Sequence, residues 1–268
     1  MPSRIDQTFA ALRQSGRKAF VAYIAAGDPS MEETLANVLT LADCGADVIE
    51  LGVPFSDPLA DGIVNQMASQ RALEAGATMA GVMRLIRSIR EKSDVPLVLF
   101  TYLNPVYAYG FEKFHADASA AGADGVLLLD LPPDEALLNK ELLGGGSLQR
   151  ICLIAPTTPA ERIHKLAAAA QGFIYYISRE GVTGAQTTLA TNIGSQVTAI
   201  KASGTAAPVC VGFGISTPEQ AREVAQSADG VVVGSAIVKV IQNHGGKPSA
   251  QQELAAFVKP LVDAVKSV

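Results

Sequence analysis

The chain has 268 residues, of which 49% are hydrophobic and 18% charged, and its formal net charge is −5 at pH 7. This composition excludes a disordered chain, and the acidic balance argues against nucleic acid or an anionic membrane as a partner. No apolar run is long enough to predict a membrane span. Three widely separated cysteines and an N-terminus without a signal peptide's apolar centre predict a reduced, cytoplasmic protein.

An amphipathic helix capped by Ser3 is expected first, near the N-terminus. Short apolar runs with little alternation follow, as is typical of parallel strands covered on both faces. The expected strands are residues 19–25, 47–51, 97–102, 125–129, 151–155, 173–177, 209–213 and 230–233. The expected helices are residues 31–42, 79–92, 111–121, 134–143, 159–169, 193–202, 218–226 and 236–242, with a closing helix in 250–268.

Eight strand–helix units predict an α/β protein, a single (β/α)8 TIM barrel with an extra N-terminal helix and an added C-terminal helix. A weak repeat supports this fold. Residues 44–52 (CGADVIELG), 121–130 (AGADGVLLLD) and 227–235 (SADGVVVGS) each end a helix, turn, and start a strand. A doubly wound open sheet stays possible, because sequence does not show closure. No linker divides the chain, so residues 1–268 are expected to form one domain.

Carboxylates gather in the stretch IELGVPFSDPLADG, where Glu50 ends an apolar strand. Asp57 and Asp61 follow on a loop stiffened by Pro54 and Pro58. In a barrel, the carboxyl ends of the strands and the loops after them form the active-site face. Glu50 and Asp61 are therefore candidates for acid/base chemistry, whereas Asp57 is interpreted as a brace of the loop.

Glycine clusters follow the last two expected strands, in GFGIS (212–216) and at Gly234-Ser235. Barrels often bind phosphate in these loops, through bare backbone N–H groups and a helix N-terminus. Glycine lets the backbone approach an anion closely. The two clusters on consecutive strands therefore predict a phosphate site.

Several motifs in register resemble the tryptophan synthase α subunit family. They are PFSDPLADG, SREGVTG, GFGIS and GSAIVK, with TYLNPVYAYG and GVLLLDLP in the same order, and the resemblance runs from about Phe20 to Ile241. It implies retro-aldol cleavage of indole-3-glycerol phosphate to indole and glyceraldehyde 3-phosphate, in tryptophan biosynthesis. It also implies an αββα complex with a β subunit that receives the indole. Pyridoxal phosphate is expected only in that partner, and no cofactor or metal in this chain.

The resemblance also implies roles for individual residues. Glu50 would be the acid/base group, Asp61 would accept the indole N1–H, and Tyr175 would place its hydroxyl near Glu50. Phosphate would bind to Gly184, Phe213, Gly214, Gly234 and Ser235, and the indole pocket would be walled by Phe20, Leu99, Tyr102, Leu127, Leu129 and Ile154. Residues 178–192 would form a lid that includes Gly181 and Thr183, with Thr183 hydrogen-bonding Asp61.

The chain departs from the family pattern after Asp61-Gly62, where Ile63 and Asn65 replace a proline and an apolar residue, and at Glu180 in the lid. Other readings stay open: a stand-alone lyase that releases free indole, and a weakly catalytic barrel that activates a β subunit allosterically. An indole-glycerol-phosphate synthase would need a catalytic lysine at a strand end, and none of the expected strands ends in one. Partner contact is expected at the active-site face, around Pro54, Asp57 and Pro132-Pro133.

Overall fold

The computed structural model describes residues 2–132, 135, 147–178, 193–212 and 214–268. Its strands form one parallel sheet in the order β5-β4-β3-β2-β1-β9-β8-β7-β6. The strands are β1 (Ala19–Ala25), β2 (Val48–Gly52), β3 (Leu97–Thr101), β4 (Gly125–Leu128), β5 (Gln149–Arg150), β6 (Cys152–Ile154), β7 (Ile174–Ile177), β8 (Val209–Gly212) and β9 (Gly230–Val233). Only Ile151 separates β5 from β6, so one extended segment pairs with both ends of the sheet. The sheet is therefore a closed barrel, as predicted, and the open-sheet alternative is wrong.

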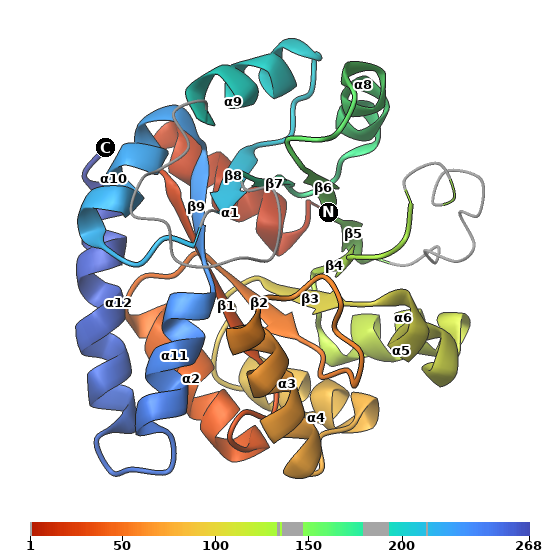
Figure 1. Ribbon diagram of the computed structural model, residues 1–268, viewed down its shortest axis with the longest axis vertical. Helices are drawn as coiled ribbons and strands as arrows, with labels where there is room; N and C mark the ends of the chain where they lie inside the picture. The colour runs from red at the N-terminus through yellow and green to blue at the C-terminus, as the bar shows by residue number, and fades with distance from the viewer. Residues whose placement is uncertain (1, 133–134, 136–146, 179–192, 213) are drawn as a thin grey trace.

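Helices surround this ring of strands (Figure 1). Those in the described residues are α1 (Arg4–Gln14), α2 (Met31–Asp43), α3 (Ile63–Glu74), α4 (Met79–Arg90), α5 (Leu103–Tyr109), α6 (Phe111–Ala121), α8 (Ala160–Ala169), α9 (Ile193–Ala202), α10 (Pro218–Ser227), α11 (Ser235–His244) and α12 (Ala250–Lys266). The sequence did not predict α3 or α5. The helix expected at 134–143 falls almost wholly outside the described residues. No helix among those described is both long and apolar enough to cross a membrane.

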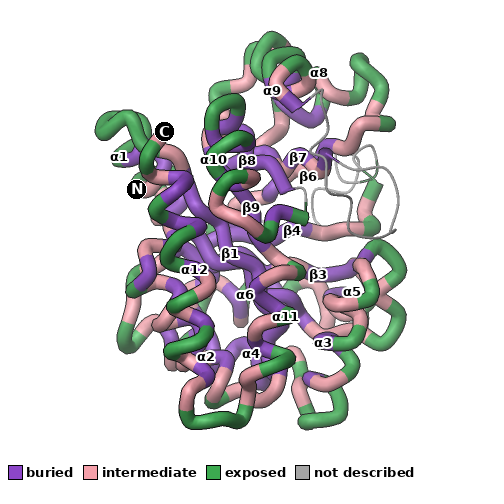
Figure 2. Tube along the Cα trace, turned by 60° about the vertical axis from the view of Figure 1, so that its left-hand side comes forward, coloured by how far each residue is buried: buried purple, intermediate pink, exposed green. Residues whose placement is uncertain are grey.

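Two layers of buried side chains lie on the two faces of the barrel wall. All seven residues of β1 are buried, and their side chains alternate between the layers. Val21 points into the barrel, whereas Phe20 packs outward against the surrounding helices. Figure 2 shows the resulting column of buried strands inside a rim of exposed helix surface.

Helix α1 closes the N-terminal end of the barrel. Ser3 caps it, since its hydroxyl accepts from the Asp6 N–H at 3.1 Å and the Asp6 carboxylate accepts from the Ser3 N–H at 3.2 Å. The buried face of α1 belongs to the same apolar cluster as the barrel interior, through Ile5, Phe9 and Leu12. The extra N-terminal helix is thus the floor of the barrel.

Three aspartates explain the repeat seen in the sequence. Each directly precedes a strand and hydrogen-bonds one residue of the preceding strand twice: its backbone N–H donates to that residue's carbonyl, and its carboxylate accepts that residue's N–H. The distances lie between 2.7 and 2.9 Å. The pairs are Asp47 with Phe20, Asp124 with Leu97, and Asp229 with Val209. We call these three arrangements the aspartate clasps; they hold neighbouring strands in register at the floor of the barrel.

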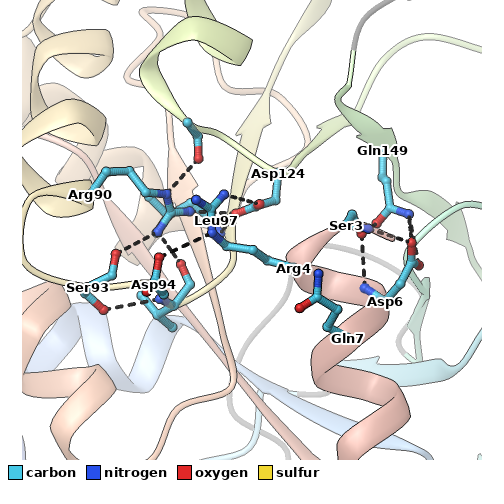
Figure 3. A network of polar contacts seen from close by, with 12 residues as sticks. Ser3, Arg4, Asp6, Gln7, Arg90, Ser93, Asp94, Leu97, Asp124 and Gln149 are labelled. Atoms are coloured by element: carbon cyan, nitrogen blue, oxygen red, sulfur yellow. Dashed lines mark hydrogen bonds and ion pairs between the residues drawn. The ribbon is translucent and has the colours of Figure 1, made fainter. Parts of the chain in front are cut away.

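The clasp at Asp124 is also the centre of an ionic network (Figure 3). Its buried carboxylate accepts from the guanidinium groups of Arg90 on α4, at 2.6 Å, and Arg4 on α1, at 3.0 Å. Arg90 also donates to the Gly122 carbonyl at 2.8 Å. The floor helix, the wall and an outer helix are thereby joined at one carboxylate.

Candidate active site

Glu50 lies inside the barrel as the central residue of β2, which continues past it to Gly52 and so does not end at the carboxylate. Its side chain alternates with the outward-facing Ile49 and Leu51, and the residue is 1% exposed. Neither carboxylate oxygen has a hydrogen-bond partner among the described residues. Burial therefore raises the pKa of Glu50 to about 8, because a charged carboxylate there loses its hydration without compensation. At neutral pH this carboxyl group is mostly protonated and can donate a proton.

Tyr23 is the register partner of Glu50 on β1, and its ring also faces the barrel interior. The ring stacks edge-on against Phe100, with centroids 5.0 Å apart. It extends over Gly52, where a built Cβ atom would lie 2.8 Å from the Tyr23 Cζ. Burial first, and then the negative charges of Asp61 and Glu50, raise the pKa of Tyr23. Both carboxylates therefore face the same small volume as this phenol.

Asp61 lies on the loop that leads from β2 to α3 and is 9% exposed. The Tyr102 hydroxyl donates to its Oδ2 at 2.9 Å while accepting the Ala60 N–H at 3.0 Å. The Asn65 side chain lies beside the same carboxylate and lowers its pKa. Burial raises the pKa of Asp61, whereas the hydrogen bonds from Tyr102 and Asn65 lower it. The site thus pairs a neutral acid with a hydrogen-bonded carboxylate.

Ser69 holds the loop before Asp61 in place. Its hydroxyl accepts the Phe55 N–H at 2.7 Å and donates to the Phe55 carbonyl at 2.9 Å. The Gln66 amide donates to the Asp61 carbonyl at 2.8 Å. Helix α3 therefore supports the loop through side-chain amides and hydroxyls. Its buried residues are small and form no apolar stripe, which is why the sequence pattern missed it.

Three of the six residues expected in the indole pocket point the wrong way. Phe20, Leu99 and Ile154 belong to the outer layer, between the strands and the helices. Their places at the inner surface are taken by Tyr23, Phe100 and Leu153. The assignment is wrong because it puts the opposite face of these strands inside the barrel. A continuously apolar strand does not reveal which of its faces is inside. Tyr23 carried a signal, since it is the one polar-tipped side chain in its strand.

The other pocket residues face inward. Leu127 and Leu129 join the interior cluster with Tyr175. The Tyr175 ring extends over Gly212, where a built Cβ atom would lie 2.8 Å from its Cζ. Burial first, then Glu50 and Asp61, raise the pKa of Tyr175. The three candidate catalytic residues therefore share one end of the barrel.

Two cavities lie beside the inner wall, and only the smaller one is lined by a candidate catalytic residue, Asp61. One, of about 10 Å³, lies between Tyr23, Phe100, Tyr102 and Asp61 and has room for about one water molecule. A larger one, of about 310 Å³, opens where β4 and β6 diverge and is lined in part by Leu129 and Leu153. An indole ring needs more space than the first cavity offers, so its entry requires side chains or the Asp61 loop to move.

The candidate phosphate residues lie at the ends of β8 and β9. Gly234 immediately precedes α11, and Ser235 is the first residue of that helix and is exposed. Gly214 is exposed and has a φ of 63°, a left-handed conformation that favours glycine. Because β8 and β9 are paired, these loops are neighbours. Gly181, Thr183, Gly184 and Phe213 lie outside the described residues.

Comparison with known proteins places this barrel among well-defined relatives. The family model described as "Tryptophan synthase alpha chain" matches residues 9–266. The tryptophan synthase alpha chain of Opitutus terrae is 52% identical over 265 residues, which cover 98% of this chain and 99% of the relative. That of Geobacter sulfurreducens is 50% identical over 263 residues, with 98% and 99% covered.

Solved structures agree. Tryptophan synthase subunit alpha from Legionella pneumophila superposes with a TM-score of 0.91 at 37% identity, covering all of both chains. A tryptophan synthase structure from Mycobacterium tuberculosis gives a TM-score of 0.89 at 34% identity, covering 99% of each chain. The likeness therefore spans the whole barrel, including the end that holds Glu50 and Asp61.

Proposed function

The chain belongs to the tryptophan synthase alpha chain family and is an indole-3-glycerol-phosphate lyase of tryptophan biosynthesis, and from this premise we propose that Glu50 and Asp61 divide the proton chemistry of the cleavage. The reaction of this family uses no cofactor, and pyridoxal phosphate resides in the β subunit. What remains for this chain is to supply a proton, remove a proton and stabilise the charge that forms between the two steps.

Glu50 moves the proton. As a neutral acid it donates to C3 of the indole ring, which leaves positive charge spread to N1. The resulting carboxylate then takes the proton of the glyceryl hydroxyl. The O–H electron pair forms the aldehyde C=O, and the pair of the breaking carbon–carbon bond returns to the ring. Glu50 ends protonated again, so one residue serves as acid and then base.

Asp61 stabilises the ring cation. A fixed carboxylate that accepts the N1–H hydrogen bond gains strength as positive charge develops there. Asp61 must be ionised for this, and the donors Tyr102 and Asn65 favour its ionised form. Tyr175 is proposed to direct its hydroxyl at the glyceryl chain, between Glu50 and the phosphate end.

The phosphate is proposed to bind at the N-terminus of α11. Gly234 and Ser235 offer backbone N–H groups and a hydroxyl there, and the helix dipole favours an anion. Gly214, on the neighbouring loop, completes the described part of the cradle. Gly184 and Phe213 stay assigned to the phosphate, and Gly181 and Thr183 to the lid, on the family motif alone.

The observation that carries the proposal is the buried Glu50 carboxyl, which lacks a partner among the described residues. A structural carboxyl would be paired, whereas this one is held neutral beside an apolar pocket. Its test is Glu50→Gln, followed by indole release from indole-3-glycerol phosphate. We expect nearly all activity to disappear while binding of an indole-alkyl phosphate analogue persists. Normal cleavage by this variant would show that another group moves the proton.

Solved tryptophan synthases imply a β-subunit partner for this chain. We propose an αββα complex in which the β subunit covers the barrel mouth. Leu59 and Ile63, beside the Asp61 loop, are 85% and 66% exposed, which suits a covered apolar surface. Indole release should rise many-fold when a matching β subunit is added. Rapid release that β does not change would instead favour a stand-alone lyase, and no release in either case an allosteric activator.

We also propose that residues 1–268 form one domain and that the protein works in the cytoplasm. Pairing of the first strand β1 with the last strand β9 supports a single domain. Three free thiols, of which Cys44 and Cys210 are buried, suit a reducing compartment. Limited proteolysis tests the first proposal, and cell fractionation tests the second.

A further inference from the structure

Asn65 places an amide group close to the Asp61 carboxylate. It lies in the first turn of α3, four residues after Asp61. Its backbone N–H bonds the Gly62 carbonyl at 3.0 Å, and its side chain lies beside the Asp61 carboxylate, whose pKa it lowers. The N-terminus of α3 therefore has no side-chain cap, because its N-cap residue is Gly62 and the Asn65 side chain is directed to Asp61.

The direction of each hydrogen bond at Asp61 follows from chemistry. An ionised carboxylate only accepts, so Asn65 donates through its Nδ2 group. The Tyr102 hydroxyl already accepts the Ala60 N–H, and it donates its own proton to Asp61. The carboxylate thus receives two donors and keeps lone pairs free for a third.

The other half of the Asn65 amide is unsatisfied. Its Oδ1 atom is buried and has no hydrogen-bond partner among the described residues. A buried amide oxygen without a donor is costly, and such groups are usually completed by a water molecule or a ligand. The donor best suited to this place is the indole N1–H, which the neighbouring carboxylate is proposed to accept.

We propose that Asn65 is a positioning residue: its Nδ2 group fixes the Asp61 carboxylate, and its Oδ1 atom adds a second acceptor for the indole N1–H. The inference rests on the proposed role of Asp61. The consequence for substrate choice is that this site favours rings with an N–H donor more strongly than a carboxylate beside an apolar residue would.

The charged and titratable groups around Asp61 decide how this can be measured. They are Tyr23 on β1, Glu50 on β2, Tyr102 after β3 and Tyr175 on β7. The phenols titrate far above neutral pH, and Glu50 determines the alkaline limb of the pH profile of kcat/KM. The acid limb of the kcat/KM profile therefore reports Asp61.

The first experiment compares pH profiles of indole release for the full chain and three variants. Asn65→Leu removes both the donor and the acceptor of the amide while keeping a side chain of similar volume. Asn65→Ala removes the same groups with a residue that favours helices. Gln70→Leu is the matched control, because the exposed Gln70 amide on the same helix bonds Glu74 and not Asp61. Both Asn65 variants should shift the acid limb upward by roughly one pH unit, and the control should not.

The second experiment measures binding of indole-3-propanol phosphate and of its benzothiophene counterpart, in which sulfur replaces N–H. The wild-type preference for the indole compound should fall several-fold in the Asn65 variants. An unshifted acid limb together with an unchanged preference would overturn the inference, as would an equal shift in Gln70→Leu.

Asp61→Asn separates this inference from the proposed function. If that variant keeps activity and the acid limb, the role of Asp61 is wrong and the inference falls with it. If Asp61→Asn abolishes activity but Asn65 variants behave as wild type, only the inference about Asn65 fails.

Discussion

Arg71 of α3 donates two parallel hydrogen bonds to the buried carboxylate of Asp28, from Nε at 2.9 Å and from Nη2 at 2.7 Å. Asp28 follows β1 and is 2% exposed. The pair fastens the far end of α3 to the barrel, while Ser69 and Gln66 hold its other end against the Asp61 loop. The helix that supports Asp61 is therefore anchored at both ends.

Removing the Arg71 side chain should destabilise the protein and disturb the site together. Arg71→Leu leaves a buried carboxylate unpaired, which we expect to lower the free energy of unfolding by about 3 kcal/mol. The value of kcat/KM should also fall, because α3 carries the supports of Asp61. Urea unfolding measures the first effect. The double variant Asp28→Asn, Arg71→Leu should recover part of the loss, and a double variant as unstable as the sum of both single changes would contradict the pairing.

The burial of Glu50 predicts a pH-dependent difference in stability between the wild type and Glu50→Gln. The folded pKa of about 8 exceeds the value of 4.5 for an unperturbed glutamate, so the native state binds more protons between these two pH values. As pH rises through this window, the free energy of unfolding of the wild type should therefore decline relative to that of Glu50→Gln, by about 1.4 kcal/mol per pH unit. Below pH 4.5 the difference in stability between the two proteins should no longer depend on pH. A constant difference between pH 5 and 8 would show that Glu50 is not buried as a neutral acid.

Activity should follow the same carboxyl group. Because the protonated form of Glu50 starts the reaction, kcat should decrease as pH rises through about 8. Steady-state rates of indole release from pH 6 to 10, with stability checked at each pH, measure this limb. An Asp57→Asn variant, altered at an exposed residue of the same loop, should show the same limb as the wild type. A rate that stays level up to pH 10 would assign the proton to a different group.

Gly52 should tolerate no side chain. A Cβ atom there would collide with the Tyr23 ring, whose Cζ and Cε2 would lie 2.8 and 2.9 Å away. Gly52→Ala should therefore displace Tyr23 from beside Glu50 and lower kcat/KM by at least tenfold. Gly62→Ala, at the other end of the loop that follows β2, is the control, since nothing lies within 4 Å of the Cβ position there. Equal activities of the two variants would show that the Tyr23 position is unimportant.

The aspartate clasp at Asp124 predicts a stability effect far from the chemistry. Asp124→Ala removes a carboxylate that accepts from Leu97, Arg90 and Arg4. The Leu97 N–H loses its partner, and the Arg90 guanidinium, whose side chain is 11% exposed, keeps its backbone carbonyls but loses its counter-charge. We expect a loss of about 3–5 kcal/mol in the free energy of unfolding. Asp94→Ala is the control, because Asp94 is 94% exposed and lies 3.6 Å from the Arg4 Nε; its loss should stay below about 1 kcal/mol.

The sequence by itself determined most of the strand–helix order and pointed to the two carboxylates of the site, and it favoured a barrel without showing its closure. Apolar runs, turn residues and acidic strand ends are local features, and they carry the same meaning before and after folding. The strand at residues 19–25 has the bounds that were expected. Eight such units predict a barrel, and the motifs around Glu50 and Asp61 consist of neighbouring residues.

Only the tertiary structure decided which face of each strand looks into the barrel. Phe20 and Leu99 were expected inside and lie outside, because strands buried on both faces show no alternation to read. The same holds for interactions between distant segments. That Tyr102 and Asn65 meet at Asp61, and that the three clasp aspartates bind the preceding strands, depends on how the wall closes. Closure brings together residues that no local pattern connects, and it alone leaves Glu50 buried and protonated.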